Sequence, residues 1–144
     1  MIKEKVFLTQ TDTTIGFVSQ NAEKLTKIKQ RPPHKHYIKA VNLLQTLKTF
    51  TRVPTLHKNR VRRAKKSTFI FPNGNSYRVV HNTSHLLLLK RFGWLYTTSA
   101  NQSGEAYNEI FAKKAASVVV TPQEAVQKAS NIYKLSTYSL KRIR

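Results

Sequence analysis

The stretch Ser67-Thr68-Phe69-Ile70-Phe71-Pro72-Asn73-Gly74-Asn75-Ser76-Tyr77-Arg78-Val79-Val80 decides the fold class of this chain. Two runs rich in β-branched and aromatic residues flank an Asn-Gly pair, a pattern typical of two antiparallel strands joined by a tight turn. The stretch therefore predicts a β-hairpin.

Strands and helices alternate outward from this hairpin. Residue patterns predict further strands at 5–9, 37–41, 94–98, 118–120 and 132–140. They predict helices at 22–30, 43–50, 84–92 and 107–115, and a capping box at Thr121-Pro122-Gln123-Glu124. Asn21 is a candidate cap for the first helix, Gly93 ends the third, and Leu43, Leu44, Leu47 and Phe50 share one face of the second. Residues 51–66 hold seven bases and are expected to form an exposed loop.

This order of elements indicates the α/β (α+β) class, a mixed sheet with helices packed on it rather than a bundle or a sandwich. The 144 residues, 40% of them hydrophobic, suit one domain over residues 1–144. No apolar run approaches the roughly 20 residues that cross a bilayer, and Met1-Ile2-Lys3-Glu4-Lys5 lacks a signal-peptide core. We therefore expect a cytoplasmic protein without membrane contact.

Positive charge dominates the composition. Twenty-six Lys and Arg face six Asp and Glu, which gives a formal net charge of +20, and no acid lies between Glu23 and Glu105. Internal salt bridges cannot neutralise such a stretch, so an anionic partner is expected, with nucleic acid the first candidate. A composition that simply favours lysine is the alternative.

The motifs that the sequence lacks argue against a thiol-dependent enzyme and against hydrolases built on a phosphate loop, paired carboxylates or a zinc helix. The sequence has no cysteine, no Gly-rich phosphate loop followed by Lys-Ser/Thr, no paired carboxylates and no His-Glu-X-X-His pattern. His34 and His36 are two residues apart but have no carboxylate or thiolate partner nearby, so we expect no metal site there.

Three polar segments are candidates for a binding site. Asp12 is the only aspartate and stands among Thr11, Thr13 and Thr14, where it suits a small zwitterion or simply a turn. Lys29, Arg31 and Lys35 surround a Pro-Pro pair at a helix end, where they suit a triphosphate or a solvated face. Ser99-Ala100-Asn101 follows a strand, at the sheet edge where open α/β sheets bind ligands.

In collinear order these segments resemble the YrdC-like threonylcarbamoyl-adenylate synthase family. The family motif Pro-Thr-Asp/Glu-Thr-X-Tyr-Gly is similar to Gln10–Gly16, and Lys-Gly-Arg-Pro-X-X-Lys/Asn-Pro-Leu is similar to Lys29–Tyr37. The motif Thr-Ser-Ala-Asn-X-Ser-Gly-Glu is present intact at Thr98–Glu105. The family's paired strands match Thr68–Pro72 and Arg78-Val79, and its C-terminal Ser-Thr-Ile/Val strand and final Arg match Ser136-Thr137-Tyr138 and Arg142 or Arg144.

The resemblance implies a twisted mixed sheet with a basic concave cleft, and an enzyme that joins L-threonine, bicarbonate and ATP into threonylcarbamoyl-adenylate and pyrophosphate for tRNA modification. It implies a catalytic tetrad of Lys29, Arg31, Ser99 and Asn101. By the same resemblance ATP is bound by Arg31, Lys35, Arg78, Asn101 and Ser136, and threonine by Thr13 and Ser99. Mg²⁺ is expected on the triphosphate, since metal-binding carboxylates are scarce. The implied partners are tRNA and a transferase that receives the product.

Five positions depart from the family pattern: Ile15, Gln30, His36, Ala40 and Asn82 stand where many members have Tyr, Gly, Pro, His and His. Two other interpretations therefore stand beside the enzyme. One is a catalytically weakened relative that binds double-stranded RNA or tRNA, and the other is an unrelated basic module such as a ribosome-associated protein.

Overall fold

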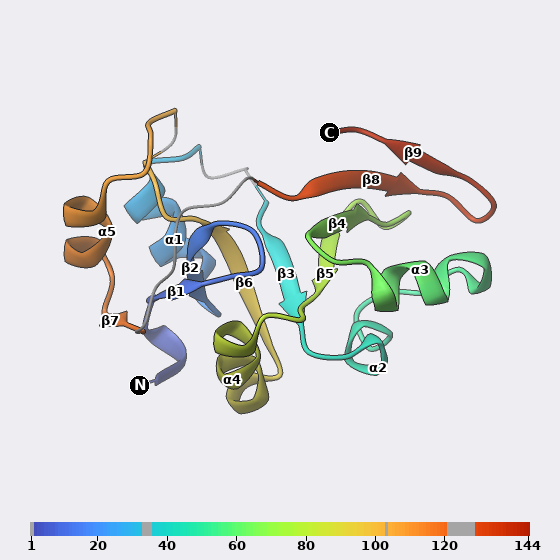
Figure 1. Cartoon of the computed structure of the whole chain (residues 1–144), viewed down its shortest axis with the longest axis horizontal. Coiled ribbons are helices and arrows are strands. Elements are labelled where there is room, and N and C mark those ends of the chain that lie inside the picture. The colour runs from blue at the N-terminus through green and yellow to red at the C-terminus, as the bar shows by residue number, and fades with distance from the viewer. Residues whose placement is uncertain (1, 33–35, 103, 121–128) are drawn as a thin grey trace.

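A computed structural model describes residues 2–32, 36–102, 104–120 and 129–144. In this part of the chain one sheet of nine strands runs through the molecule in the order β7-β1-β2-β6-β3-β5-β4-β8-β9 (Figure 1). The strands are β1 (Phe7–Gln10), β2 (Ile15–Ser19), β3 (Ile38–Val41), β4 (Ser67–Ile70), β5 (Ser76–Val79), β6 (Trp94–Ser99), β7 (Val118–Val119), β8 (Asn131–Leu135) and β9 (Leu140–Arg142).

The sheet is mixed, as expected. The strand pairs β3–β5, β4–β8 and β1–β7 are parallel, and the other neighbours are antiparallel. Strand β2 approaches β6 so closely that a Cβ on Gly16 would lie 2.9 Å from the carbonyl oxygen of Thr98. A glycine is therefore needed where the Thr11–Thr14 turn enters the sheet.

Helices gather at both ends of the sheet and beside its middle. They are α1 (Ala22–Lys29), α2 (Leu44–Leu47), α3 (Lys58–Arg63), α4 (Thr83–Phe92) and α5 (Glu109–Ala115), with short 3₁₀ turns at η1 (Ile2–Glu4) and η2 (Thr55–His57). In Figure 1, α1 and α5 lie near β1 and β2, whereas α2 and α3 lie at the opposite end near β4 and β5.

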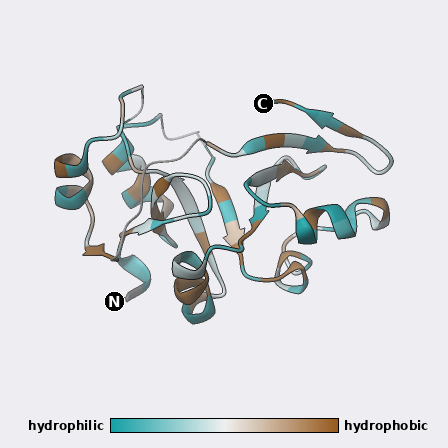
Figure 2. Cartoon of the chain, viewed as in Figure 1, coloured by the Kyte–Doolittle hydropathy of each residue, from teal (hydrophilic) through white to brown (hydrophobic). Residues whose placement is uncertain are grey.

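Three apolar clusters bury the faces of these elements. One holds Phe17 and Leu25 beneath α1 and α5, a second holds Val80 and Leu89 beneath α4, and the third holds Val61 and Phe69 between α3 and the sheet. Burial of apolar area is the main stabilising term in folding, so these clusters hold the helices on the sheet. Figure 2 shows apolar residues in brown within α1 and α4, whereas α3 and β9 are largely teal, or hydrophilic.

The structure confirms the elements that have sharp local signals. Asn21 caps α1 by accepting a hydrogen bond from the Lys24 backbone N–H at 3.1 Å. The hairpin pairs β4 with β5, and Gly74 adopts a φ of 87° in its turn. Gly93 ends α4 with a φ of 84°, and β6 follows at once.

The prediction of an exposed loop at residues 51–66 is wrong, because this segment contains η2 and α3. The many bases drew attention away from a helical pattern in this segment. Val53, His57 and Val61 recur every four residues, and all three are buried.

Two further expectations are corrected. Residues 132–140 do not form one strand: β8 and β9 are separate strands that pair across a turn, in which the Ser136 backbone N–H donates to the carbonyl of Ser139. Leu43 precedes the short helix α2 and is exposed, although Leu44 and Leu47 are buried.

Strand β2 was not predicted, and the capping box at 121–124 lies outside the described residues.

Candidate active site

Lys29 joins the end of α1 to the loop after β6. Its Nζ donates hydrogen bonds to the Ser99 carbonyl at 2.9 Å and to Asn101 Oδ1 at 3.1 Å, and it lies 3.4 Å from Ser99 Oγ. Ser99 Oγ also donates to Asn101 Oδ1 at 2.5 Å. The structure therefore brings Lys29, Ser99 and Asn101 into one hydrogen-bonded cluster.

The way in which α1 ends directs Arg31 toward the same place. Gln30 adopts the left-handed conformation, with φ 54° and ψ 42°, and the Arg31 backbone N–H donates to the Thr26 carbonyl at 3.2 Å. This reversal is a common helix C-terminus, and glycine favours it most. The Arg31 guanidinium then lies over the ring of Tyr37, 4.8 Å from its centroid, and the Tyr37 hydroxyl is 2.9 Å from Thr26 Oγ1. Stacking and the chain reversal together orient Arg31.

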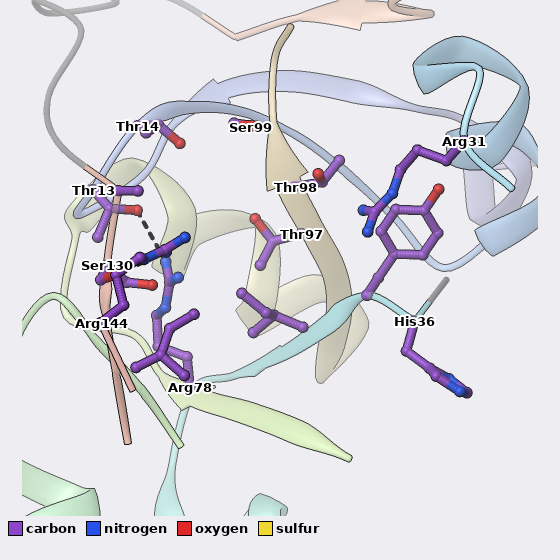
Figure 3. Close-up of a pocket in the computed structure, with 14 residues that line it drawn as sticks. Thr13, Thr14, Arg31, His36, Arg78, Thr97, Thr98, Ser99, Ser130 and Arg144 are labelled. Atoms are coloured by element: carbon purple, nitrogen blue, oxygen red, sulfur yellow. Dashed lines mark hydrogen bonds between the residues drawn. The ribbon is translucent and has the colours of Figure 1, made fainter. Parts of the chain in front are cut away.

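A polar cavity of about 250 Å³ opens beside these residues (Figure 3). Its walls come from the Thr11–Thr14 turn, the segment after α1, and β3, β5, β6 and β8. They include Thr13, Thr14, Arg31, His36, Tyr37, Ile38, Arg78, Thr97, Thr98, Ser99, Ala129, Ser130, Ile132 and Arg144. Three guanidinium groups and several hydroxyls make this cavity suited to an anionic, oxygen-rich ligand.

Arg78 is the buried cation at the base of the cavity, with only 4% of its surface exposed. Its Nη1 lies 3.4 Å from Asp12 Oδ1 and donates to Thr13 Oγ1 at 3.1 Å, while its Nε and Nη2 donate to Thr68 Oγ1. The lone aspartate therefore pairs with Arg78 and does not line the cavity. Because Arg78 holds Thr13 from behind, the hydroxyl of Thr13 is fixed at the cavity wall.

Burial shifts the proton affinity of the cations in this site. Burial first, and the nearby charge of Arg31 second, together lower the pKa of Lys29 to about 8. Burial also lowers the pKa of Arg78, against the opposing effect of the Asp12 carboxylate. Cations that are incompletely compensated by the protein favour an incoming anion.

The structure therefore gathers most of the residues expected from the sequence. Thr13, Arg31, Arg78 and Ser99 line one cavity, and Lys29 and Asn101 are hydrogen-bonded to Ser99 behind its wall. Lys35 lies outside the described residues.

Ser136 is not brought to this cavity, which corrects the expectation for its position. Ser136 lies in the turn between β8 and β9, where its carbonyl contacts His57 Nε2 at 3.0 Å. The opposite end of β8 reaches the cavity, through Ser130 just before the strand and Ile132 within it. In this structure Ser130 and Ile132 line the cavity, whereas Ser136 does not.

Sequence reasoning missed Ser130 and underused Arg144. Ser130 Oγ is 2.8 Å from Thr68 Oγ1, and Arg144 donates twice to the Ser130 carbonyl at 3.1 and 2.9 Å. The available signal was the serine just before Asn131-Ile132-Tyr133, a run with strand-forming residues.

Among the described residues no group of three or more His, Asp or Glu could hold a metal ion. No helix in the described ranges has the length and apolarity needed to span a bilayer.

A family model for Sua5_yciO_yrdC, described as telomere recombination, matches residues 1–144. The chain belongs to the Sua5/YciO/YrdC family. A curated relative, the uncharacterized protein MG259 homolog of Mycoplasma pneumoniae, is 39% identical over 98 residues, which are 65% of this chain and 20% of the relative. The MG259 protein of Mycoplasma genitalium is 30% identical over 105 residues, 68% of this chain and 21% of that protein. The chain thus spans about a fifth of the length of these relatives.

Solved structures share the Sua5/YciO/YrdC fold across nearly the whole chain. P. abyssi Sua5 complexed with L-threonine aligns with a TM-score of 0.82 at 15% identity, over 99% of this chain and 51% of that one. E. coli YciO aligns with a TM-score of 0.77 at 18% identity, over 97% and 82%. Full-length HypF in its phosphate- and nucleotide-bound form aligns with a TM-score of 0.78 at 15% identity, over 99% and 27%.

Proposed function

We propose that this chain is a threonylcarbamoyl-adenylate synthase, which converts L-threonine, bicarbonate and ATP into threonylcarbamoyl-AMP, pyrophosphate and water. The observation that carries the proposal is the Lys29–Ser99–Asn101 cluster beside a cavity lined by Arg31, Arg78 and Thr13. Two proteins of the same fold support these substrates, since P. abyssi Sua5 was solved with L-threonine and HypF with phosphate and nucleotide bound.

The chemistry suits a site made of cations and hydroxyls. The threonine amine and bicarbonate form a carbamate with loss of water, and a carbamate oxygen then attacks the α-phosphorus of ATP. The bond between the α-phosphorus and the bridging oxygen breaks, and pyrophosphate leaves. Because the attacking oxygen is already anionic, this step needs charge neutralisation and alignment more than a strong base.

Each residue has a role in this proposal. Arg31 and Arg78 neutralise the phosphates, Thr13 and Ser99 hold threonine, and Lys29 and Asn101 fix the loop that carries Ser99. Ser130 and Arg144 replace Ser136 as contacts from the C-terminal strands. The role of Lys35 in ATP binding stays a prediction. Mg²⁺ arrives on the triphosphate as part of the substrate.

The cavity of about 250 Å³ is smaller than the usual site for a ligand of nucleotide size. A second hollow of about 250 Å³ shares His36 and Tyr37 with it and extends to Lys39 and Tyr77. In this proposal ATP and threonine together occupy these two neighbouring hollows. The proposal places the protein in the cytoplasm, and a transferase partner would pass the threonylcarbamoyl group to tRNA.

Release of pyrophosphate from ATP, measured with and without threonine and bicarbonate, tests this function. Lys29→Ala and Arg31→Ala should each lower kcat/KM by about 10²-fold or more, because Arg31 neutralises charge in the transition state and Lys29 positions the loop that carries Ser99. Lys27→Ala is the matched control, because Lys27 is an exposed cation on the same helix. A folded wild-type chain that releases no threonine-dependent pyrophosphate overturns the proposal.

A second candidate is a relative that binds RNA without turnover. The unpaired positive charge favours it, because the described residues contain only two ion pairs, Arg78–Asp12 and Lys113–Glu109. Tight tRNA binding that weakens steeply with salt, in a chain that releases no pyrophosphate, would establish this second function in place of the first.

A further inference from the structure

Another hollow, separate from the two beside Tyr37, lies at the end of the molecule that carries α3. It has a volume of about 670 Å³ and is bounded by the segment before η2, the β4–β5 turn and the β8–β9 turn. Its lining includes Phe50, Arg52, Leu56, Pro72, Asn73 and Tyr138. None of its lining residues belongs to the cavity of the candidate active site.

Two large side chains at this hollow face solvent. Tyr138 is 84% exposed and Leu56 is 65% exposed, and both line the hollow together with the partly buried Phe50. Tyr138 makes no hydrogen bond or ring contact with any other described residue. An aromatic ring that the fold does not use is available to stack on a planar ligand.

The elements next to this hollow carry many cations and no acids. Arg52 lines it, α3 carries Lys58, Arg60, Arg62 and Arg63, and the β8–β9 hairpin carries Lys134, Lys141 and Arg142. No Asp or Glu occurs in residues 38–82 or 129–144.

The two basic elements belong to one packed unit. Val61 of α3 and Leu135 of β8 share a buried cluster, and His57 at the end of η2 contacts the carbonyl of Ser136 in the hairpin turn. In Figure 1, α3 and the β8–β9 hairpin lie at the same end of the molecule. Their cations therefore belong to one packed unit that borders the hollow.

We propose that this hollow binds an unpaired base of a single-stranded nucleic acid, with Tyr138 stacking on the base and Arg52 holding a neighbouring phosphate. The cations of α3 and of the β8–β9 hairpin contact the phosphates on either side. An acidic protein would match the charge but would have no need for an exposed ring beside it. A duplex would match the charge but keeps its bases stacked inside. A single strand uses both features, since proteins bind it with aromatic platforms within a basic groove.

The proposal is independent of catalysis, so the binding titrations contain no threonine, and ATP is added only in a separate competition arm. A short fluorescently labelled RNA and a DNA of the same sequence are titrated with the protein, and anisotropy is followed at several salt concentrations. Wild-type binding should weaken steeply as salt rises, by about 0.7 in log K per phosphate contact for each decade of salt. RNA and DNA single strands of equal affinity identify base and phosphate as the recognised groups, whereas preference for RNA adds the sugar hydroxyl.

Three variants separate stacking from charge. Tyr138→Ala should weaken single-strand binding about tenfold at an unchanged salt slope, and Tyr138→Phe should keep the wild-type affinity. Arg52→Ala should reduce the salt slope by about one phosphate contact. Because Tyr138 and Arg52 are exposed, these changes leave the core intact. Matched controls are Ile110→Ala, an exposed apolar residue on α5, and Lys27→Ala on α1.

Four results would overturn the proposal. The first is that Tyr138→Ala and Arg52→Ala bind single strands as tightly as their control variants do. The second is that duplex binds as tightly as single strand and that Tyr138→Ala does not change this affinity. Polyglutamate that competes as well as RNA at equal charge would identify an acidic protein as the partner. Saturating ATP that displaces the RNA would move its site to the cavity beside Arg31.

Discussion

The ammonium group of Lys29 lies 3.1 Å from Oδ1 of Asn101 and 2.9 Å from the carbonyl oxygen of Ser99, a residue 70 positions later in the chain. This contact joins the end of α1 to the loop after β6, and it is almost fully removed from water, since Lys29 is 4% exposed. A buried ammonium without a carboxylate partner costs free energy in its charged form. When Lys29 is protonated, its positive charge is therefore not neutralised by the protein and lies beside the cavity.

The burial of Lys29 should be visible in the pH dependence of stability. The pKa of Lys29 is lowered to about 8 by burial and then by Arg31, whereas an unfolded chain has a lysine pKa of about 10.4. Between these values the unfolded state binds more protons, so stability rises with pH by at most about 3 kcal/mol. Lys29→Met should lack this rise. Urea unfolding of both proteins across this pH window measures it.

Lys27→Met is the control for that experiment, because it removes an exposed cation from the same helix and lowers the net charge equally. The wild type and this control should show the same rise. If all three curves are parallel, Lys29 is not titrating in the folded state near pH 8.

Arg78 and Asp12 should show strong energetic coupling. Arg78→Met leaves the Asp12 carboxylate largely buried without its partner, and should lower the free energy of unfolding by about 3–5 kcal/mol. Asp12→Asn should cost less, because Arg78 keeps its hydrogen bonds to Thr13 and Thr68. In the double variant the unpaired charge is gone, so part of the loss should be recovered. A double-mutant cycle measured by urea unfolding gives the coupling, and additive effects would show that the pair does not interact.

How much of this fold and site the sequence could predict depends on whether each signal is local. Asn73-Gly74, Asn21 and Gly93 each act within a few residues, and the turn and helix ends that they predicted are present. Strand β2 was missed because all five of its residues are buried, so they do not alternate between polar and apolar.

The site was predictable to the extent that its segments carry distinctive residues. Lys29, Arg31 and Ser99-Ala100-Asn101 were recognised and lie together. Ser136 was assigned because Ser136-Thr137 matches the Ser-Thr of the family motif, whereas Ser130 lines the cavity. Only the pairing of β4 with β8 shows which end of the strand faces the cavity. Such pairing joins residues far apart in the chain, and no local pattern encodes it.

Gln30 should be replaceable by glycine with a gain in stability. Its φ of 54° is costly for a residue with a Cβ but not for glycine. Gln30→Gly should therefore raise the free energy of unfolding by up to about 1 kcal/mol, with the α1 reversal and Arg31 unchanged. Urea unfolding measures the gain, and Lys27→Gly, within the helix, should instead lose about 1 kcal/mol. Equal losses in both variants would mean that Gln30 is not left-handed in solution.

His85 should lower the stability of the fold, although it lies on the buried side of α4. It is fully buried, and neither ring nitrogen has a hydrogen-bond partner among the described residues. Burial and then the charge of Arg78 lower its pKa to about 3. His85→Leu removes two unpaired polar atoms and should raise the free energy of unfolding by about 1–3 kcal/mol at neutral pH.

The advantage of His85→Leu should also grow in acid. Between pH 6.5 and about 3 the unfolded chain protonates this histidine and the folded chain does not, so the wild type loses stability as pH falls through this range. The leucine variant lacks that loss. Thermal unfolding of both proteins at several pH values measures the difference, with His81→Leu as the control because His81 is exposed. If His85→Leu is less stable than the wild type at every pH, the ring nitrogens are satisfied in solution and the histidine stabilises the fold.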